Sequence, residues 1–173
     1  MKSISVFRAI TLVLLLPALL VGPIPLFAST APPVSVITVQ ITGLACTTSL
    51  GAGQFNAAAW SWGASTGATG VTTFGDLSIS KVFDDCSPAL FGLVVVGTPI
   101  TTLVLTEHSA GVPPAPLMQI TLSTVRAASY QLVGDQSTAS PTEQLMFVFG
   151  KITIQNLVNG ARFCYDVVKR VKC

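Results

Sequence analysis

The sequence predicts an all-β protein: a small β-barrel or sandwich of six to seven strands with one flanking α-helix. Three observations support this prediction. Apolar and polar residues alternate with a period of two along most of the chain after residue 33, one segment carries helix start and stop signals, and loops rich in Gly, Ser, Thr and Pro separate the alternating runs. Period-two alternation is typical of strands with one buried face, and short strands between turns favour a barrel or sandwich.

The first 28 residues are typical of a secretory signal peptide. Lys2 and Arg8 give a basic start, residues 9–21 are almost wholly apolar, and small residues follow before two prolines. We place the cleavage site after Ala28. An uncleaved membrane anchor is disfavoured because a spanning helix needs ~20 apolar residues and Pro17 interrupts this run. We therefore expect a secreted or periplasmic protein without a stable membrane span after cleavage.

The predicted organisation is a leader, 1–28, followed by one domain, 29–173. The whole chain has nine basic and seven acidic residues. Two of the basic residues lie in the leader, which leaves seven of each sign in the domain. A neutral surface argues against nucleic-acid binding, which requires clustered positive charge. Neutrality also removes one common guard against self-association.

The predicted strands follow the alternating runs in chain order. Those with one apolar face are 37–42, 77–80, a shorter one from 103 that ends near 107, 118–123 and 151–155. The segment Leu145–Phe149 is apolar on both faces, which is typical of a strand covered on both sides. We expect one of its faces to point into the barrel and the other to pack against a helix or a neighbouring subunit. Loops are expected at 63–70, 109–116, 134–141 and 156–160.

One helix is predicted over residues 89–96. Ser87 is its expected N-cap, Pro88 suits the first helical position, and Gly97 is the expected stop. The β-branched residues 94–96 weaken the helical pattern, so a strand is the alternative here.

The polar residues form no recognisable catalytic or cofactor motif. Asp84 and Asp85 are adjacent and would point to opposite sides of an extended strand, so they do not form a catalytic carboxylate pair. We expect them to lie at the approach to the helix, because the helix dipole favours acidic residues near its N-terminus. Ser87 lacks the Gly-x-Ser-x-Gly context of a nucleophile, and the single histidine, His108, is expected at a surface or turn. The Gly-rich segment 63–70 lacks the phosphate-loop pattern. We expect no catalytic residue, cofactor or metal.

Four cysteines lie after the leader: Cys46, Cys86, Cys164 and Cys173. An even number in an exported chain indicates disulfides, with three pairings open. A zinc site is disfavoured because no two cysteines have ligand spacing. Pairing Cys164 with Cys173 requires a reversal near 169–172, since nine extended steps span ~30 Å and a disulfide needs Cα atoms ~5.5 Å apart. Without that reversal, Cys173 would pair elsewhere or bridge two subunits.

Trp60 and Trp62 are two residues apart, so they share one face of a strand. They could form an aromatic contact surface, such as a sugar platform, or pack in the core. We favour core packing for at least one, because the large area of an indole dominates the cores that contain it.

Several motifs, in order and spacing, resemble the Hcp family of type VI secretion tube proteins. They are Ala59-Trp60-Ser61-Trp62-Gly63, then Asp76 to Lys81, then Asp84, Ser87-Pro88 and Leu90 at the helix entry, Gly97 and Ile100 at its exit, Met118 to Leu122, Glu143 with 147–154, and Cys164 to Val167. The resemblance spans about residues 34–172. The departures are the leader, the cysteines (Cys164 stands where the family usually has glycine) and the low charge.

The resemblance implies a β-barrel with one helix, whose subunits form hexameric rings that stack into a tube. The family's tube is propelled by a contractile sheath and its lumen can carry effectors, so effectors and secretion-apparatus proteins are the implied partners beside other copies of the chain. The implied topology places Cys46 and Cys86 at the same end of the barrel, which favours Cys46–Cys86 and leaves Cys164 for Cys173. We expect the subunit contacts among 63–70, 109–116 and the outer face of 145–149.

Two other functions remain open from the sequence. The leader and the cysteines favour an exported binding module that keeps the barrel but acts independently of the secretion machine. A hydrolase would need a nucleophile, a base and an orienting group held together, and a chain with one histidine offers few candidates.

Overall fold

The computed structural model describes residues 35–136 and 138–173, which belong to one compact unit. The predicted leader and its cleavage site lie outside the described residues. The elements, in chain order, are β1 (Val36–Ile41), β2 (Thr47–Thr48), β3 (Gly51–Ala52), β4 (Gln54–Ala57), β5 (Ala59–Ser61), β6 (Ala64–Thr66), β7 (Thr72–Phe74), β8 (Leu77–Val82), α1 (Ser87–Val96), β9 (Ile100–His108), β10 (Pro116–Val133), β11 (Thr142–Asn156), β12 (Arg162–Asp166) and β13 (Val171–Lys172).

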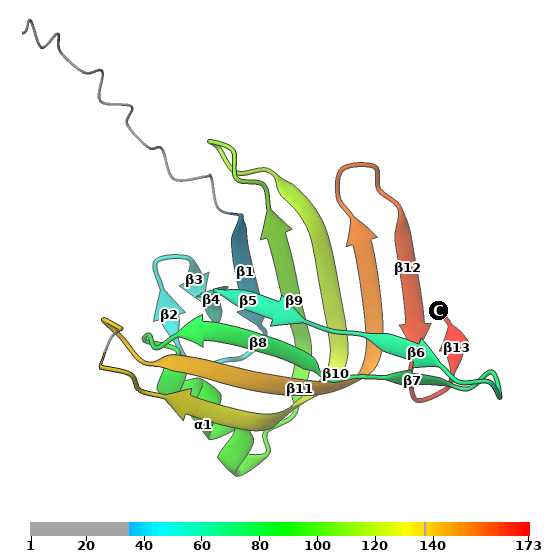
Figure 1. Cartoon of the computed structure of the whole chain (residues 1–173), viewed down its shortest axis with the longest axis horizontal. Coiled ribbons are helices and arrows are strands. Elements are labelled where there is room, and N and C mark those ends of the chain that lie inside the picture. Colours follow the sequence, from blue (N-terminus) through cyan, green and yellow to red (C-terminus); the bar gives the residue numbers. More distant parts are fainter. Residues whose placement is uncertain (1–34, 137) are drawn as a thin grey trace, which may run out of the picture. The chain divides into compact units, whose positions relative to one another are not determined.

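The strands form a closed barrel, which confirms the predicted all-β class with one helix (Figure 1). Strand pairing runs from β1 through β9, β10, β11 and β8 to β5, and β4 pairs with β1 again. Only Ala58 separates β4 from β5, and its N–H donates to the carbonyl of Ser80 at 2.8 Å. The stretch from β4 to β5 therefore leaves one side of the sheet and joins the other, as a strand must to close a barrel.

The period-two pattern places one face of each strand in the barrel core. Along β1 the side chains of Ile37, Val39 and Ile41 are buried, and Leu103, Leu105, Ile120 and Leu122 meet them from β9 and β10. On β11, Leu145 and Phe147 are fully buried while Met146 and Val148 face outward and are more than a third exposed. The segment predicted to be apolar on both faces thus has one face inside the barrel and an outer face that α1 does not cover.

The two longest strands extend beyond the barrel. β11 pairs with β8 over Thr142–Phe147 and with β12 over Lys151–Gln155, so β12 and β13 continue the sheet past the barrel wall. Beside this extension lies the β6–β7 hairpin (Figure 1). The hairpin corrects the prediction of a plain loop at 63–70: short polar residues there pair across the two strands, and Gly70 (φ +75°) allows the turn between them.

An aromatic cluster joins the hairpin to the extension. The ring of Trp62 lies 6.3 Å from that of Phe74 and 6.4 Å from that of Phe149, and Phe74 stacks on Tyr165 at 5.3 Å. Such offset aromatic pairs contribute about 0.5–1.5 kcal/mol each beyond the area that they bury. The cluster fixes the hairpin against β11 and β12.

Helix α1 begins one residue earlier than the capping pattern predicts. Its N-cap position is Cys86, and the Ser87 hydroxyl forms no cap bond; instead it accepts a hydrogen bond from the N–H of Asp84 at 2.8 Å. The prediction of Ser87 as the N-cap was therefore wrong, because this side chain turns back toward the preceding loop. Pro88 lies in the first turn, and Gly97, with φ +69°, ends the helix in the left-handed conformation as predicted.

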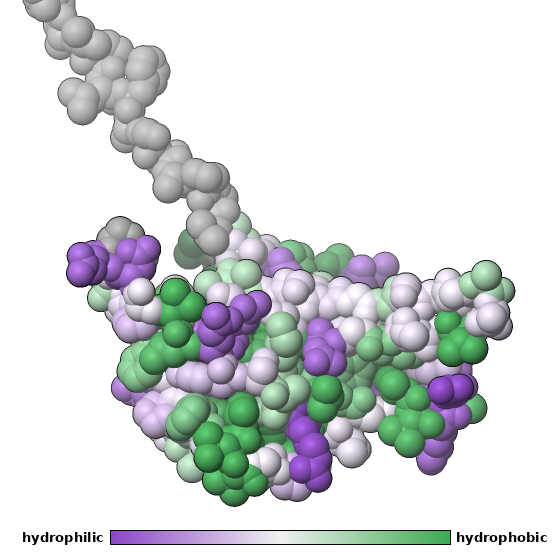
Figure 2. Space-filling view, turned by 60° about the horizontal axis from the view of Figure 1, so that its bottom comes forward, coloured by the Kyte–Doolittle hydropathy of each residue, from purple (hydrophilic) through white to green (hydrophobic). Residues whose placement is uncertain are grey.

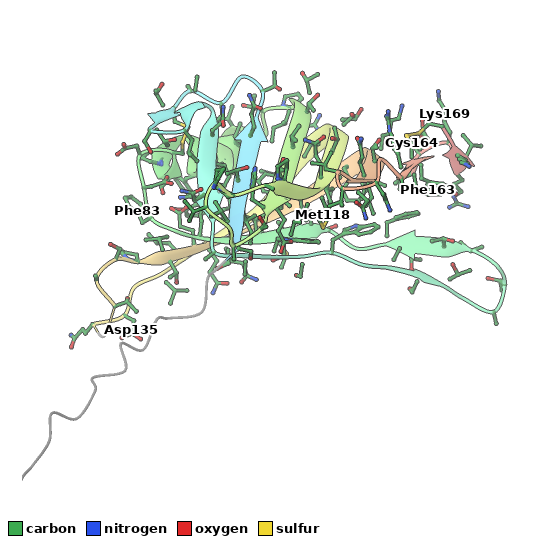
Figure 3. The ribbon with its side chains drawn as sticks, turned by 90° about the horizontal axis from the view of Figure 1, so that it is seen from above. Phe83, Met118, Asp135, Phe163, Cys164 and Lys169 are labelled. Atoms are coloured by element: carbon green, nitrogen blue, oxygen red, sulfur yellow. A yellow bond between two sulfur atoms is a disulfide. The ribbon has the colours of Figure 1, made fainter. Side chains whose placement is uncertain are left out.

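Both disulfides predicted from the family topology are present. Cys46 bonds to Cys86, which ties the loop after β1 to the start of α1. Cys164 bonds to Cys173, because the chain reverses over residues 167–170 and β13 pairs with β12. The backbone N–H of Lys169 holds this reversal by donating to the carboxylate of Asp166 at 2.8 Å. Figure 3 shows Phe163, Cys164 and Lys169 gathered at this end of the molecule.

Candidate functional site

A buried ion pair joins two neighbouring strands of the barrel. Lys81 on β8 and Glu143 on β11 are register partners, and the Lys81 ammonium lies 2.9 Å from Oε2 of Glu143. Both side chains have no solvent exposure. The ammonium also donates to Oδ1 of Asp84 at 2.8 Å and to the Ser87 hydroxyl at 3.1 Å. Burying charges in this way is tolerated only when hydrogen bonds satisfy them, as they do here.

Tyr130 on β10 completes the network. Its hydroxyl donates to Oε1 of Glu143 at 2.7 Å, so both oxygens of this buried carboxylate are hydrogen-bonded. Burial, followed by the hydrogen bond and the negative charge of Glu143, raises the pKa of Tyr130 to about 12. Strands β8, β10 and β11 are thus joined through side chains as well as through the sheet.

The same network fixes the chain as it enters α1. Oδ1 of Asp84 accepts a hydrogen bond from the N–H of Cys86 at 2.9 Å, while the Asp84 N–H donates to Ser87. Asp84 therefore supports the helix approach, as predicted from its position, whereas Asp85 is exposed. Each charged group of this network is occupied by another protein group, so the arrangement holds structure in place and presents no activated nucleophile.

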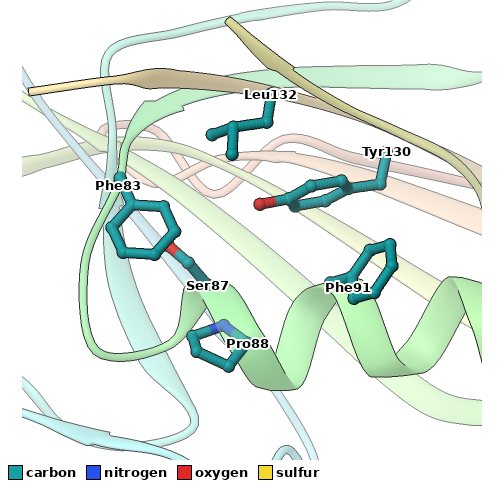
Figure 4. Close-up of a pocket in the computed structure, with 6 residues that line it drawn as sticks. All are labelled: Phe83, Ser87, Pro88, Phe91, Tyr130 and Leu132. Atoms are coloured by element: carbon teal, nitrogen blue, oxygen red, sulfur yellow. The ribbon is translucent and has the colours of Figure 1, made fainter. Parts of the chain in front are cut away.

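An apolar groove borders this network and shares Ser87 and Tyr130 with it (Figure 4). Phe83, Pro88 and Phe91 form one wall, and Tyr130 and Leu132 on β10 form the other. The groove encloses about 450 Å³, with Ser87 among the residues that line it. The rings of Phe91 and Tyr130 pack at 5.4 Å. Tyr130 thus takes part in both features, because its hydroxyl reaches the ion pair while its ring lines the groove.

The apolar surface continues beyond the groove along α1. Phe91, Val95 and Val96 are all more than half exposed, and Val133 follows Leu132 at the end of β10. Figure 2 shows hydrophobic residues gathered on this face of the molecule. Contiguous apolar patches of this kind mark interaction sites on soluble proteins. The face is therefore suited to contact with another apolar surface.

The other residues singled out in the sequence lie elsewhere. Trp60 and Trp62 both pack, half-buried, against the core, and the Trp60 indole donates to Oε2 of Glu107 at 3.2 Å. This agrees with core packing rather than with an exposed sugar platform. Asp76 and Gly63 are exposed. His108, at the end of β9, has Nδ1 3.3 Å from the carbonyl oxygen of Val36 and meets no carboxylate in the described contacts.

The buried ion pair and the groove were not predicted from the sequence. A signal for the pair was present: Lys81 continues the inward positions of Leu77 and Ile79, and Glu143 precedes the inward Leu145 and Phe147. A basic residue and an acidic residue that stand where the alternation of two strands places inward-facing side chains indicate a buried ion pair. The groove had no comparable signal, because it depends on how α1 sits against β10.

The fold and these contacts can be compared with known proteins. Residues 39–155 match the family described as "Type VI secretion system effector, Hcp". The chain belongs to the Hcp family. Because Hcp proteins are structural rather than enzymatic, the protein is a structural one, and the hydrolase interpretation is rejected. No curated protein sequence matches this Hcp chain significantly.

Solved structures share the Hcp fold at low sequence identity. Hcp1 from Salmonella typhimurium is 20% identical with a TM-score of 0.68, over 80% of this chain and 99% of that one. A type VI secretion system effector from Yersinia pestis is 21% identical with a TM-score of 0.66, over 76% and 99%. The secreted protein Hcp3 from Pseudomonas aeruginosa is 16% identical with a TM-score of 0.58, over 76% and 96%. The family's tube-protein fold is thus preserved in this chain.

The cysteines bear on the location of this Hcp chain. All four cysteines are in disulfides, which are typical of proteins that fold outside the cytoplasm. Within residues 35–136 and 138–173, no helix has the length and apolar character needed to cross a membrane.

Proposed function

We propose that the chain, after loss of its leader, assembles into hexameric rings that act as tube units in type VI secretion. The outer face of β11 is the observation that carries this proposal. Met146 and Val148 project from the barrel wall and are exposed, whereas Leu145 and Phe147 between and beside them are buried. Neighbouring exposed apolar side chains are typical of contact surfaces, and a neighbouring copy is the partner that Hcp membership supports.

The surroundings of this strip also favour association between identical copies. The outward residues of the adjoining strand β8, Ser78 and Ser80, are small and uncharged. Gln144 donates to Ser78 across the two strands at 3.3 Å. On the β8 side a like copy can therefore approach without desolvating a charge, whereas on the β10 side the exposed Arg126 is the register partner of Val148 and borders the contact. A closed ring would use this strip and a different patch on the next subunit.

The mass of the assembled chain tests the proposal. We expect residues 29–173, purified with disulfides intact, to elute as a hexamer by size-exclusion chromatography with light scattering. Val148→Lys places a charge in the proposed contact and should give monomers. Val158→Lys, the same change at an exposed loop valine between β11 and β12, is the control and should leave the hexamer intact. A wild-type monomer at micromolar concentration would contradict ring formation.

We also propose that the chain reaches this assembly by export, with cleavage after Ala28 and a secreted or periplasmic mature protein. The basic and apolar order of the leader and the two disulfides support this route. Mass spectrometry of the non-reduced protein recovered outside the cytoplasm gives the mature N-terminus. A mass that retains residues 1–28 would reject the cleavage.

A second candidate is an exported Hcp-like module that binds a partner independently of the secretion machine. The leader and disulfides favour it, because the family's tube subunits are loaded inside the cytoplasm. This candidate predicts that the wild-type protein forms neither rings nor stacks in electron micrographs.

A further inference from the structure

The loop between β9 and β10 presents an apolar tip. Val112 is fully exposed at its apex, and Pro113 and Pro114 beside it are also exposed. The base of the loop is closed by two hydrogen bonds, from the Ser109 N–H to the Ala115 carbonyl at 2.7 Å and from the Ala115 N–H to the Ser109 hydroxyl at 3.0 Å. A short loop with two prolines and a closed base loses little entropy when it binds.

The groove and this tip lie at opposite ends of the same strand. β10 begins at Pro116, just after the tip, and reaches the groove with Tyr130 and Leu132 near its other end. The course of β9 supports the same placement, because β9 starts after α1 and ends at the tip. Figure 1 shows the loop at the top of the barrel and α1 at the bottom.

We propose that Val112, Pro113 and Pro114 of one copy insert into the groove of the next copy, so that subunits of successive rings stack end to end. This inference rests on the proposed function and names the contact that joins its rings. The groove supplies Phe83, Phe91 and Leu132 as apolar walls, and the tip supplies three apolar side chains of matching character. Neither the tip nor the walls of the groove carries a charged residue, so insertion desolvates no ion.

The arrangement of the two surfaces decides the kind of assembly. A protruding apolar residue and a complementary pocket elsewhere on the same molecule make a head-to-tail contact, which closes into a ring or continues as an open array according to geometry. Here the loop and α1 lie on opposite sides of the barrel in Figure 1, so we expect the contact to repeat from copy to copy in one direction rather than to close. The strip of Met146 and Val148 on the barrel wall is separate and remains free for contacts within a ring.

Three variants of the exported chain, residues 29–173, test the contact. Val112→Asp places a charge on the tip, and Leu132→Lys places one in the groove. The double variant Val112→Asp/Leu132→Lys pairs the two charges across the contact between copies, although the two residues are distant within one copy. Val158→Asp, in the exposed loop after β11, is the matched control. Ring mass is read by light scattering, and stacking by sedimentation and electron microscopy.

We expect the wild type and the control to form stacked rings. Each single variant should keep the hexamer mass but lower the sedimenting fraction about tenfold or more, because a buried valine or leucine contact is replaced by an unpaired charge. The double variant should recover part of the stacking. Stacking that survives Val112→Asp, absence of recovery in the double variant, or an equal loss with Val158→Asp would overturn the inference and leave the groove to another occupant.

The design separates this inference from the proposed function. If the wild type forms no hexamer, the proposal of ring formation fails, and the inference is then tested on the monomer. End-to-end association of monomers supports the inference if it increases with concentration and is lost with Val112→Asp. A wild-type chain that shows no such association at any accessible concentration overturns it.

Discussion

At the residue scale, Lys81 and Glu143 hold charges inside a barrel that is otherwise apolar. Four oxygen atoms lie within hydrogen-bond distance of the Lys81 ammonium and share its three N–H groups: those of Glu143, Asp84, Ser87 and the carbonyl of Val82. These bonds replace the water that the ammonium loses on burial, which is costly for an isolated ion. The main effect of the pair is to fix the start of α1 relative to β8 and β11, rather than to raise the free energy of unfolding.

Lys81→Met should strongly destabilise the fold. It leaves the Glu143 carboxylate buried without its cation, and breaking such a pair costs about 3–5 kcal/mol. Lys81→Met/Glu143→Met removes both charges and should recover a large part of that cost. The free energy of unfolding in urea measures both effects. Lys169→Met is the control, because Lys169 is 77% exposed and its nitrogen lies 4.0 Å from Asp166. A control that loses as much as Lys81→Met would contradict this account.

The Tyr130 hydroxyl gives a pH dependence whose sign follows from its raised pKa. The folded-state pKa is about 12 and the ordinary value is 10.0. Between these values the unfolded chain releases the phenol proton while the folded chain keeps it. The contribution of Tyr130 to stability is therefore complete below pH 10 and is lost as the pH rises through 12.

Tyr165→Phe leaves Tyr130 as the single tyrosine, so its titration can be followed by near-ultraviolet phenolate absorbance. We expect a midpoint well above that of free tyrosine while circular dichroism shows the folded protein. Adding Glu143→Gln should lower the midpoint, because it removes the negative charge beside the hydroxyl. A folded protein that titrates at the ordinary value would disprove the hydrogen bond to Glu143.

At the scale of elements, α1 is held at both of its ends. Cys86 is bonded to Cys46, Ser87 and Asp84 belong to the ion network, and Arg126 donates to the carbonyl of Gly97 at the other end of the helix at 2.9 Å. The helix itself has apolar residues on all sides and several exposed valines, so its sequence alone does not fix which face it buries. Tertiary contacts therefore decide the shape of the groove.

The two disulfides should contribute unequally to stability. They close loops of 40 and 9 residues, and in the chain-entropy description these loops correspond to about 4 and about 2.5 kcal/mol. Cys46→Ala/Cys86→Ala should therefore destabilise the protein more than Cys164→Ala/Cys173→Ala. Urea unfolding of both pairs under oxidising conditions measures the difference. A larger loss from the C-terminal pair would show that β13 supports more of the fold than its two residues suggest.

At the scale of the whole molecule, the sequence predicted the barrel and its single helix because alternation and helix-ending glycine are local signals. The inward face predicted for Leu145–Phe149 is confirmed, whereas its outer face does not pack against α1 and its contact with a neighbouring subunit stays a prediction; the cysteine pairing followed from the implied topology. The β6–β7 hairpin was missed because its strands are short and polar, without the alternation that marks a buried face. The groove was missed because residues from α1 and the far end of β10 meet there only after folding.

The proposed contact surfaces lie on different parts of the molecule, so both can be used at once. The barrel wall offers the outward side of β11, and the barrel ends offer the β9–β10 tip and the groove. Closure of the barrel satisfies the backbone of its strands internally, so association depends on side chains rather than on open strand edges along the wall.

The Cys46–Cys86 bond has a mechanical consequence. When force is applied to the two ends of the oxidised chain, the segment between these cysteines, which are 40 positions apart, cannot extend, and this withholds ~140 Å of contour at about 3.5 Å per residue. A subunit under tension would thus lengthen far less than its reduced counterpart, even after its strands had separated. The Cys46–Cys86 disulfide therefore makes the oxidised subunit resistant to mechanical extension.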